Sequence, residues 1–445
     1  MHLVIIGNGI AGITAACTAR RLDPAARITL VSAESAHHYS RPALMYLYMS
    51  HLRYPDVKPY GDWFWAENRL DLIQAEAIGL DTAAHTVQLD DGQALVYDRL
   101  LLATGSVSRF YDWPGQQLRG VQGLYGLPDL EQMERDTHGI RQAVVVGGGL
   151  IGIELAEMLH SRGIHVTFLV RENRYWASVL PPEEGALVEQ QILHHSIDLK
   201  LNTGLGEILG DADGRVRAVV TTAGQELPAQ WVGLATGVVP NRALAQAAGL
   251  DTDRGILVDE FLKTSAPDVY AAGDCAQHRQ PAPGEVPVEQ LWYTGRMQGE
   301  AAGEAICGAH APYRRGVWFN SAKFFTLDYH TYGRVPARPE AGTASFCWQH
   351  PSGGHLLRIN FRPAENCAVT GMNALGLRQR HEVWERWLRE KTPVQTVLHE
   401  LGAANFDPEF FRRHEAVIRH EFTRQFPDLL LTAPRRRGLF AALRR

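Results

Sequence analysis

The sequence predicts an α/β protein in which two parallel-sheet domains precede a smaller α+β domain. Two glycine-rich loops, at residues 7–12 and 147–152, support this prediction, because each follows an apolar run and precedes a helical stretch. A third observation is the change after about Tyr313, where short apolar and aromatic runs are followed by helical stretches, one of them from Arg378 to Glu390. At roughly 150 residues per domain, a chain of 445 residues suits about three domains.

Composition and charge exclude several classes of protein. Hydrophobic residues make up 45% and charged residues 21%, which is globular usage and rules out a long disordered chain. The net charge of -5 disfavours a nucleic-acid partner, which needs a basic footprint. Five scattered cysteines and nineteen histidines lack metal-ligand spacing, so we expect no disulfide framework and no metal site. Neither a signal-peptide pattern nor a long apolar run is present, so we expect a cytoplasmic protein without a transmembrane segment.

The first glycine loop has the features of a dinucleotide-binding fingerprint. It reads Gly7-Asn8-Gly9-Ile10-Ala11-Gly12, between an expected strand at 3–6 and an expected helix at 13–21. The first two glycines allow the turn and the close approach of a pyrophosphate, and the third lets the helix pack on the strand. The amino end of the helix favours the phosphate charge. After a second expected strand comes Glu34, an acidic residue near the position that contacts a ribose.

The second glycine loop repeats this pattern. It reads Gly147-Gly148-Gly149-Leu150-Ile151-Gly152, between an expected strand at 143–146 and an expected helix at 153–162. Two fingerprints in one chain predict two dinucleotide sites. Here the position that is usually acidic is Val170, and Arg171 and Arg174 follow. An arginine there accommodates a 2′-phosphate, so we expect NADPH to be used at least as well as NADH, although Glu172 opposes this.

Two short runs and one Gly-Asp pair are further candidates for cofactor binding. Ala103-Thr104-Gly105 and Ala235-Thr236-Gly237 each end an apolar strand. Gly273-Asp274 also follows an apolar run, and it places a carboxylate where it could hold a cofactor hydroxyl.

The order of these motifs resembles that of the two-dinucleotide flavoproteins, the pyridine nucleotide-dependent reductases. They include rubredoxin and ferredoxin reductases, the FAD domain of nitrite reductase, NADH oxidases and coenzyme A disulfide reductases. The resemblance implies two Rossmann-like domains that bind FAD (1–112 and 246–315) and NAD(P)H (113–245), a C-terminal α+β domain (316–432) and a basic tail (433–445). The expected cofactor-binding residues are Gly7, Gly9, Gly12, Glu34, Arg41, Pro42, Ala103, Thr104, Gly105, Gly147, Gly149, Gly152, Arg171, Arg174, Gly237, Gly273, Asp274 and Trp292.

The departures from the family pattern are as informative as the matches. Where coenzyme A disulfide reductases and NADH oxidases carry a redox cysteine beside the flavin, this chain has Pro42. Where the ferredoxin-reductase branch carries a lysine near the flavin, this chain has Tyr46, but the glutamate that pairs with the lysine is kept as Glu154. The resemblance therefore implies Glu154 and Tyr46 as catalytic candidates, with Glu154 positioning the nicotinamide amide. Ala33 replaces a usual acidic residue, which leaves the ribose contact to Glu34 or to water.

Several of these residues have a simpler structural explanation. Trp292 and Tyr293 fall where the family covers the flavin, but core packing explains them equally well. Trp63 and Trp65 could gate the flavin, although packing under a loop is the better explanation. Glu154 could be a surface carboxylate favoured by the helix dipole. Cys275, directly after Asp274, is expected to be a small buried residue.

The expected function is that of an enzyme that passes electrons from NAD(P)H through FAD to an acceptor. Without a thiol at Pro42, we expect a small ferredoxin- or rubredoxin-like electron carrier rather than a disulfide. The alternatives are NADH oxidase-like reduction of oxygen or a small molecule, and an interaction or assembly flavoprotein with slow turnover. A homodimer is left open. The tail arginines, Arg435–Arg437 and Arg444–Arg445, could attract an acidic carrier or belong to a frayed terminus.

Overall fold

The computed structural model describes residues 1–406, 412–429 and 431, and contacts divide the chain into two compact units. Unit 1 consists of Met1–Arg171 and Ile197–Arg315, and unit 2 consists of Glu172–Ser196 and Gly316–Arg445. The segment Glu172–Ser196 thus groups with the C-terminal part of the chain, whereas the sequence interpretation included it in the domain at 113–245. The expected basic tail, with Arg435–Arg437 and Arg444–Arg445, lies outside the described residues.

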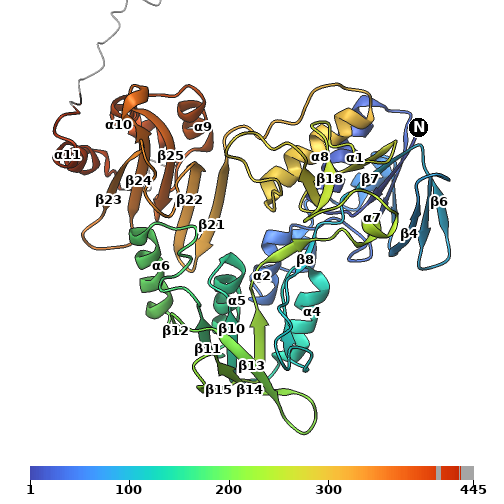
Figure 1. Ribbon diagram of the computed structural model, residues 1–445, viewed down its shortest axis with the longest axis horizontal. Helices are drawn as coiled ribbons and strands as arrows, with labels where there is room; N and C mark the ends of the chain where they lie inside the picture. Colours follow the sequence, from blue (N-terminus) through green and yellow to red (C-terminus); the bar gives the residue numbers. More distant parts are fainter. Residues whose placement is uncertain (407–411, 430, 432–445) are drawn as a thin grey trace, which may run out of the picture. The chain divides into compact units, whose positions relative to one another are not determined.

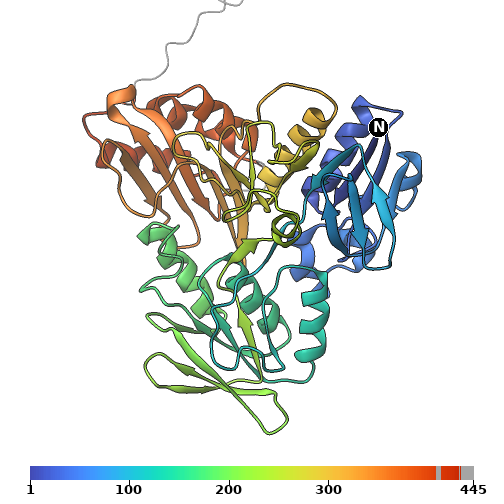
Figure 2. The ribbon, with the colours of Figure 1, turned by 45° about the vertical axis from the view of Figure 1, so that its right-hand side comes forward.

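Unit 1 contains the first of the two expected parallel sheets. Its strand order is β19-β7-β1-β2-β3, and all of its strand pairs are parallel. The strands are β1 (His2–Ile6), β2 (Arg27–Val31), β3 (Leu70–Ile73), β7 (Arg99–Leu102) and β19 (Val269–Ala271). Helix α1 (Ile10–Leu22) follows β1, and helix α8 (Trp292–Ile306) packs against α1. The two helices lie side by side in both ribbon views (Figure 1 and Figure 2).

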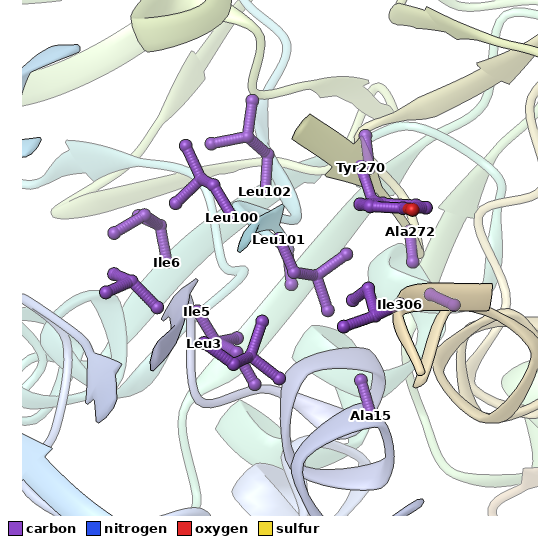
Figure 3. Packing of buried hydrophobic residues seen from close by; sticks show 14 of the residues in the cluster. Leu3, Ile5, Ile6, Ala15, Leu100, Leu101, Leu102, Tyr270, Ala272 and Ile306 are labelled. Atoms are coloured by element: carbon purple, nitrogen blue, oxygen red, sulfur yellow. The ribbon is translucent and has the colours of Figure 1, made fainter. Parts of the chain in front are cut away.

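Buried apolar side chains line the strands of the first sheet. Leu3 and Ile5 of β1 and Leu101 of β7 have no exposed surface, as expected for the apolar runs of a covered parallel sheet. Figure 3 shows these side chains packed with Ala15 of α1 and with Ile306 at the end of α8. The carboxyl ends of parallel strands lie at the same edge of a sheet, and the first glycine loop leaves β1 at this edge.

The second parallel sheet of unit 1 has the order β12-β11-β10-β16-β9. Its strands are β9 (Val121–Gln122), β10 (Gln142–Val146), β11 (His165–Leu169), β12 (Asp198–Lys200) and β16 (Trp231–Leu234). Helix α4 (Leu127–Asp136) precedes β10, and helix α5 (Leu150–Ser161) follows it. The prediction of two parallel sheets is confirmed. Helices α1 and α5 both begin three residues before their predicted starts, because the third glycine of each loop lies inside the first helical turn.

Shorter elements complete unit 1. Strands β8 (Ser106–Ser108) and β17 (Val238–Pro240) form an antiparallel pair in the two segments that join the parallel sheets along the chain. The remaining strands are β4 (Ala77–Asp81), β5 (Thr86–Leu89), β6 (Ala94–Val96), β13 (Leu205–Gly210), β14 (Val216–Thr221), β15 (Glu226–Pro228), β18 (Ile256–Val258) and β20 (Ala276–His278). The remaining helices are η1 (Arg41–Ala43), α2 (Leu44–Tyr48), η2 (Tyr54–Val57), α3 (Trp63–Glu67) and α7 (Ala243–Ala247).

Unit 2 is built on an antiparallel sheet of order β21-β22-β25-β24-β23. Its strands are β21 (Phe319–Phe324), β22 (Leu327–Gly333), β23 (Ala344–Gln349), β24 (Leu356–Arg362) and β25 (Ala368–Leu375). Its helices are α6 (Pro182–His194), η3 (Pro363–Glu365), α9 (His381–Arg389), α10 (Val394–Glu400), η4 (Leu401–Ala404) and α11 (Glu415–Gln425). This is the expected α+β architecture. Helix α9 begins after the predicted Arg378, because Arg380 is still extended, with φ -75° and ψ 123°.

A buried ion pair explains why the segment Glu172–Ser196 belongs to unit 2. Glu184 of α6 is fully buried, and its Oε1 accepts a hydrogen bond of 2.7 Å from Nε of Arg358 in β24. Asn373 Nδ2 of β25 donates to the same oxygen at 3.2 Å. Because a buried charge needs a partner, these bonds tie α6 to the antiparallel sheet. Among the residues that the structure describes, no helix is long and apolar enough to cross a membrane.

Candidate dinucleotide-binding sites

The first glycine loop joins β1 to α1, and its three predicted glycines have different spatial roles. Gly7 has a φ of +110°, and a Cβ there would lie 2.1 Å from the carbonyl oxygen of Ala103. A Cβ on Gly12 would lie 2.0 Å from the carbonyl oxygen of Gly7. Gly9 is the N-cap of α1, and nothing lies within 4 Å of a Cβ placed on it. Gly7 and Gly12 therefore shape the loop, and Gly9 leaves open space beside the amino end of α1, where phosphate binds favourably.

The second glycine loop joins β10 to α5 with nearly the same geometry. Gly147 has a φ of +117°, and a Cβ there would lie 2.2 Å from the carbonyl oxygen of Ala235. A Cβ on Gly152 would lie 2.0 Å from the carbonyl oxygen of Gly147. Gly149 is the N-cap of α5 and has nothing within 4 Å of an added Cβ. Each loop thus meets the strand of its own sheet that ends in the Ala-Thr-Gly run.

The two loops differ at the residue between the first two glycines. In the first loop Asn8 is buried, and its Nδ2 donates to the carbonyl oxygen of Ser35 at 2.8 Å. Nδ1 of His38 donates to the carbonyl oxygen of Asn8 at 2.8 Å, and burial lowers the pKa of His38 to about 4, so the ring is neutral. In the second loop Gly148 has no side chain, and a Cβ there would lie 2.8 Å from Cγ1 of Val170. The first loop is therefore bonded to the segment after β2, and the second rests on an apolar side chain.

Glu34, the predicted ribose contact, lies in a network of protein hydrogen bonds. Nη1 and Nη2 of Arg41 donate to its two carboxylate oxygens at 2.9 and 2.8 Å. Oε1 also accepts from the Tyr39 hydroxyl and, at 3.0 Å, from the backbone N–H of Leu127. Burial raises the pKa of Glu34, but the charge of Arg41 and these bonds outweigh burial and lower it overall. Oε2 keeps one acceptor position, so the ribose contact stays a prediction.

The predicted Asp274 follows Gly273, which has a φ of +82°. Oδ2 of Asp274 accepts hydrogen bonds of 3.2 Å from the hydroxyls of Ser106 and Tyr125. Burial raises the pKa of Asp274, and these two bonds oppose that rise. The sequence interpretation missed Tyr125 altogether. The local sequence signal that could have pointed to Tyr125 is the glycine that follows it. A Cβ on Gly126 would lie 2.4 Å from Oε1 of Glu34.

The two Ala-Thr-Gly runs begin the segments that join the sheets. Thr104 Oγ1 donates to the carbonyl oxygen of Asn241 at 2.6 Å, and Thr236 Oγ1 donates to that of Arg109 at 3.0 Å. Gly105 and Gly237 have φ values of +68° and +101°. Each threonine thus fastens one segment to the other, which explains why a short run of small residues recurs at both places.

The two catalytic candidates lie on neighbouring helices. Glu154 is half-buried on α5, and burial together with the charge of Glu157 raises its pKa to about 7. Tyr46 is half-buried on α2, where its ring stacks on that of His51 at a centroid distance of 6.3 Å. Helix α2 contacts α5. Glu154 is therefore a carboxyl group that gains or loses its proton near neutral pH, two residues beyond the second glycine loop.

The remaining predicted residues occupy different surroundings. Pro42 is exposed in η1, and Trp292 is half-buried at the start of α8, in edge contact with Tyr293. Trp63 is 67% exposed, whereas Trp65 packs into the core below the surface of α3. Arg171 is exposed in unit 1, and Arg174 belongs to unit 2.

These sites define a class of protein before any comparison is made. FAD fits the first loop, because open space at Gly9 adjoins a helix amino end and the partly exposed Asp274 offers a carboxylate to ribitol hydroxyls. A second dinucleotide fits the matching space at Gly149. Two such sites in one compact unit are the mark of a flavoprotein that takes a hydride from a nicotinamide coenzyme, for which FAD supplies the redox chemistry.

Comparisons with known proteins identify the family. The model of the pyridine nucleotide-disulphide oxidoreductase family matches residues 1–299, and the chain belongs to this family. Rhodocoxin reductase of Rhodococcus erythropolis is 32% identical over 330 residues, which is 73% of this chain and 76% of the relative. The crystal structure of a ferredoxin reductase from Rhodopseudomonas palustris is 26% identical, with a TM-score of 0.76 over 84% of this chain and 91% of that one. An NAD-dependent persulfide reductase from A. fulgidus is 25% identical, with a TM-score of 0.82 over 96% and 84%.

The protein is therefore an NAD(P)H-dependent flavoprotein reductase with FAD as its cofactor. This confirms the enzyme class and the two cofactors predicted from the glycine loops. The roles of the individual residues stay predictions, and their geometry is the basis of the proposals below.

Proposed function

We propose that the protein passes electrons from NAD(P)H through FAD to a small electron-carrier protein. The observation that supports this acceptor is Pro42, an exposed residue at the position where disulfide-reducing members carry a redox cysteine. Reduction of a disulfide or peroxide through the protein needs a thiolate beside the flavin. Without one, electrons must leave from the flavin edge to a docked partner or to oxygen. The proposal includes a cytoplasmic location.

Cys275 does not replace the missing thiol. Its side chain has no exposed surface, and Sγ donates to the carbonyl oxygens of Leu102 and Ala272 at 3.4 Å. Burial raises the pKa of Cys275, so the group stays a protonated thiol. Although it follows Asp274 directly, it is a packing residue of the first sheet.

In this proposal the two loops divide the work. The loop at 7–12 and Asp274 hold FAD, with Glu34 beside its adenosine half and Arg41 beside the flavin. The loop at 147–152 holds the coenzyme, and Glu154 hydrogen-bonds the nicotinamide amide. Holding the two rings in reactive alignment supplies much of the rate, so no protein nucleophile is required. The rhodocoxin and ferredoxin reductases among the relatives support a carrier as acceptor.

A second candidate acceptor is a sulfane or disulfide sulfur. The persulfide reductase from A. fulgidus aligns over 96% of the chain, which includes unit 2. This candidate needs a reactive thiol, and the experiment that separates the two therefore targets cysteine chemistry.

The test is steady-state turnover of the full-length holoprotein with NADPH and NADH. One set of assays offers a [2Fe–2S] ferredoxin or a rubredoxin, and the other offers coenzyme A disulfide, coenzyme A persulfide or oxygen. We expect carrier reduction to be the fastest reaction and to survive alkylation of all accessible cysteines, and Cys275→Ser to behave like the native chain. Fast disulfide or persulfide reduction that alkylation abolishes would contradict the proposal. Light scattering on the same sample tests for a homodimer, which the sequence leaves open.

A further inference from the structure

Tyr125 connects two parts of the FAD site that lie far apart in the sequence. Its hydroxyl donates to Oδ2 of Asp274 at 3.2 Å and accepts from the backbone N–H of Ser106 at 2.9 Å. The guanidinium of Arg41 lies over its ring, 4.3 Å from the centroid. Nη1 of Arg41 also donates to the carbonyl oxygen of Tyr125 at 2.7 Å. Tyr125 thus contacts both the expected flavin-side arginine and the expected ribitol carboxylate.

The bonds on Asp274 are asymmetric. The hydroxyls of Tyr125 and Ser106 both donate to Oδ2, and Gln290 Nε2 holds the Ser106 hydroxyl at 2.8 Å. These bonds fix the rotation of the carboxylate and leave Oδ1 to accept from a ligand hydroxyl. Burial raises the pKa of Tyr125, so its hydroxyl keeps the proton that it donates.

Two glycines leave the space that Tyr125 and its contacts occupy. Gly105 has a φ of +68°, and a Cβ on it would lie 2.7 Å from the Tyr125 hydroxyl oxygen. A Cβ on Gly126 would lie 3.1 Å from Nη1 of Arg41. A larger residue at Gly105 would push the tyrosine hydroxyl away from its partners, and a larger residue at Gly126 would displace the Arg41 guanidinium that lies over the ring. Gly105, the glycine of the first Ala-Thr-Gly run, is therefore needed both for the positive φ of the turn and for the position of the Tyr125 hydroxyl.

We propose that Tyr125 is a positioning residue of the FAD site, which orients Asp274 toward the ribitol and holds Arg41 beside it. The inference rests on the proposed role of Asp274 in binding FAD. Removal of the hydroxyl frees the carboxylate to rotate, and FAD should then leave the protein faster. The loss of one hydrogen bond to a charged group corresponds to a change on the order of tenfold.

The chain offers a matched control for Tyr125 at Tyr48. Its ring lies under the guanidinium of Arg162 at 3.6 Å, and its hydroxyl shares a hydrogen bond of 2.7 Å with Thr137. Tyr48 is fully buried and has no contact with Asp274 or Arg41 among the described interactions. Tyr48→Phe therefore removes the same hydroxyl from a similar tyrosine–arginine pair outside the site.

The experiment measures the rate of FAD release from diluted holoprotein by flavin fluorescence. The variants are Tyr125→Phe, Tyr48→Phe, Asp274→Ala and the double variant Tyr125→Phe/Asp274→Ala, and each melting temperature is recorded. We expect Tyr125→Phe to release FAD about tenfold faster and Tyr48→Phe to release it at the native rate. The double variant should match Asp274→Ala alone, because Tyr125 acts through that carboxylate.

The possible failures point to different errors. If Asp274→Ala keeps FAD at the native rate, the proposed role of Asp274 is wrong. If Asp274→Ala releases FAD quickly but Tyr125→Phe does not, the inference about Tyr125 is wrong and the proposed function stands. Equal acceleration in Tyr48→Phe would also overturn the inference, because it would indicate general loosening of the fold. Additive effects in the double variant would overturn it too, because they would show that Tyr125 acts independently of Asp274.

Discussion

The two glycine loops share one backbone design but differ in how each is anchored. In both, a Cβ added to the first or the third glycine would lie about 2 Å from a backbone oxygen, so only glycine fits. The second glycine is the N-cap of the helix and has open space beside it. Beyond the glycines, the first loop is bonded through Asn8 to Ser35 and His38. The second loop has Gly148 at the position of Asn8, and the buried Val170 lies beneath it.

This difference fits the different lifetimes of the two bound molecules. A resident cofactor needs a site whose donors and acceptors are held in place, and in the proposed FAD site the network from Glu34 through Arg41 and Tyr125 to Asp274 would hold them. A coenzyme that must leave after every turnover needs fewer fixed contacts. Near the second loop, the half-buried Glu154 lies in α5, two residues beyond Gly152. The same glycine fingerprint can thus suit a cofactor that stays bound or a coenzyme that dissociates after each turnover, depending on the residues around it.

The largest expected effects come from closing the open spaces at Gly9 and Gly149. Both residues are N-caps with negative φ, -66° and -105°, so alanine fits the backbone of either. In Gly9→Ala the methyl group should block the FAD pyrophosphate and weaken FAD binding by about tenfold or more. Gly149→Ala should retain FAD and raise the KM for the coenzyme to a similar extent. Flavin fluorescence and steady-state kinetics separate the two, and a loss of FAD in Gly149→Ala would contradict the division between the loops.

A smaller effect is expected from Glu154→Gln. Because the pKa of Glu154 is raised to about 7, the folded protein holds a proton that the unfolded chain releases near pH 4.5. Stability should therefore fall as the pH rises from 4.5 to 7, and Glu154→Gln should remove this fall. The native chain should bind coenzyme more tightly above pH 7, where the carboxylate can accept a bond from the amide.

Glu157→Gln is the matched control for Glu154. The charge of Glu157 raises the pKa of Glu154. Removal of that charge should therefore move the midpoint of the pH dependence to lower pH without abolishing the dependence. Stopped-flow reduction of the flavin between pH 5.5 and 8.5 gives the midpoints. Identical profiles for the native chain and Glu154→Gln would exclude Glu154 from the coenzyme site.

The smallest expected effect concerns the choice of coenzyme. Arg171 follows the buried Val170 at the end of β11 and is exposed. Because a guanidinium suits a phosphate dianion and solvent screens an exposed ion pair, Arg171→Ala should lower kcat/KM for NADPH several-fold, on the order of 1 kcal/mol. The value for NADH should change little. A strong preference for NADH in the native chain that Arg171→Ala leaves unaltered would refute the prediction.

The sequence predicts what depends on near neighbours. The glycine loops were recognisable because each strand, turn and helix is contiguous, and both parallel sheets followed from them. Tyr125 could not be found this way, since its partners Arg41 and Asp274 are 84 and 149 residues away. The surroundings of Glu34 were missed for the same reason, because the N–H of Leu127 reaches it from 93 residues away. Motifs defined by residue spacing do not reveal such contacts, because the residues next to a polar side chain do not indicate its partner in a distant part of the sequence.

The buried pair of Glu184 and Arg358 also bears on how the chain is made. The two residues are separated by 174 positions, so α6 leaves the ribosome long before β24 exists. At about 5–20 residues per second, that interval is roughly 10–30 s. Throughout it, the carboxylate and the buried side chains of α6 have no antiparallel sheet to cover them, although β16 of the parallel sheet is synthesised early in the same interval. A substitution at Arg358 would extend this condition to the complete chain, because the buried carboxylate would then have lost its charged partner, and we expect a lower yield of folded protein.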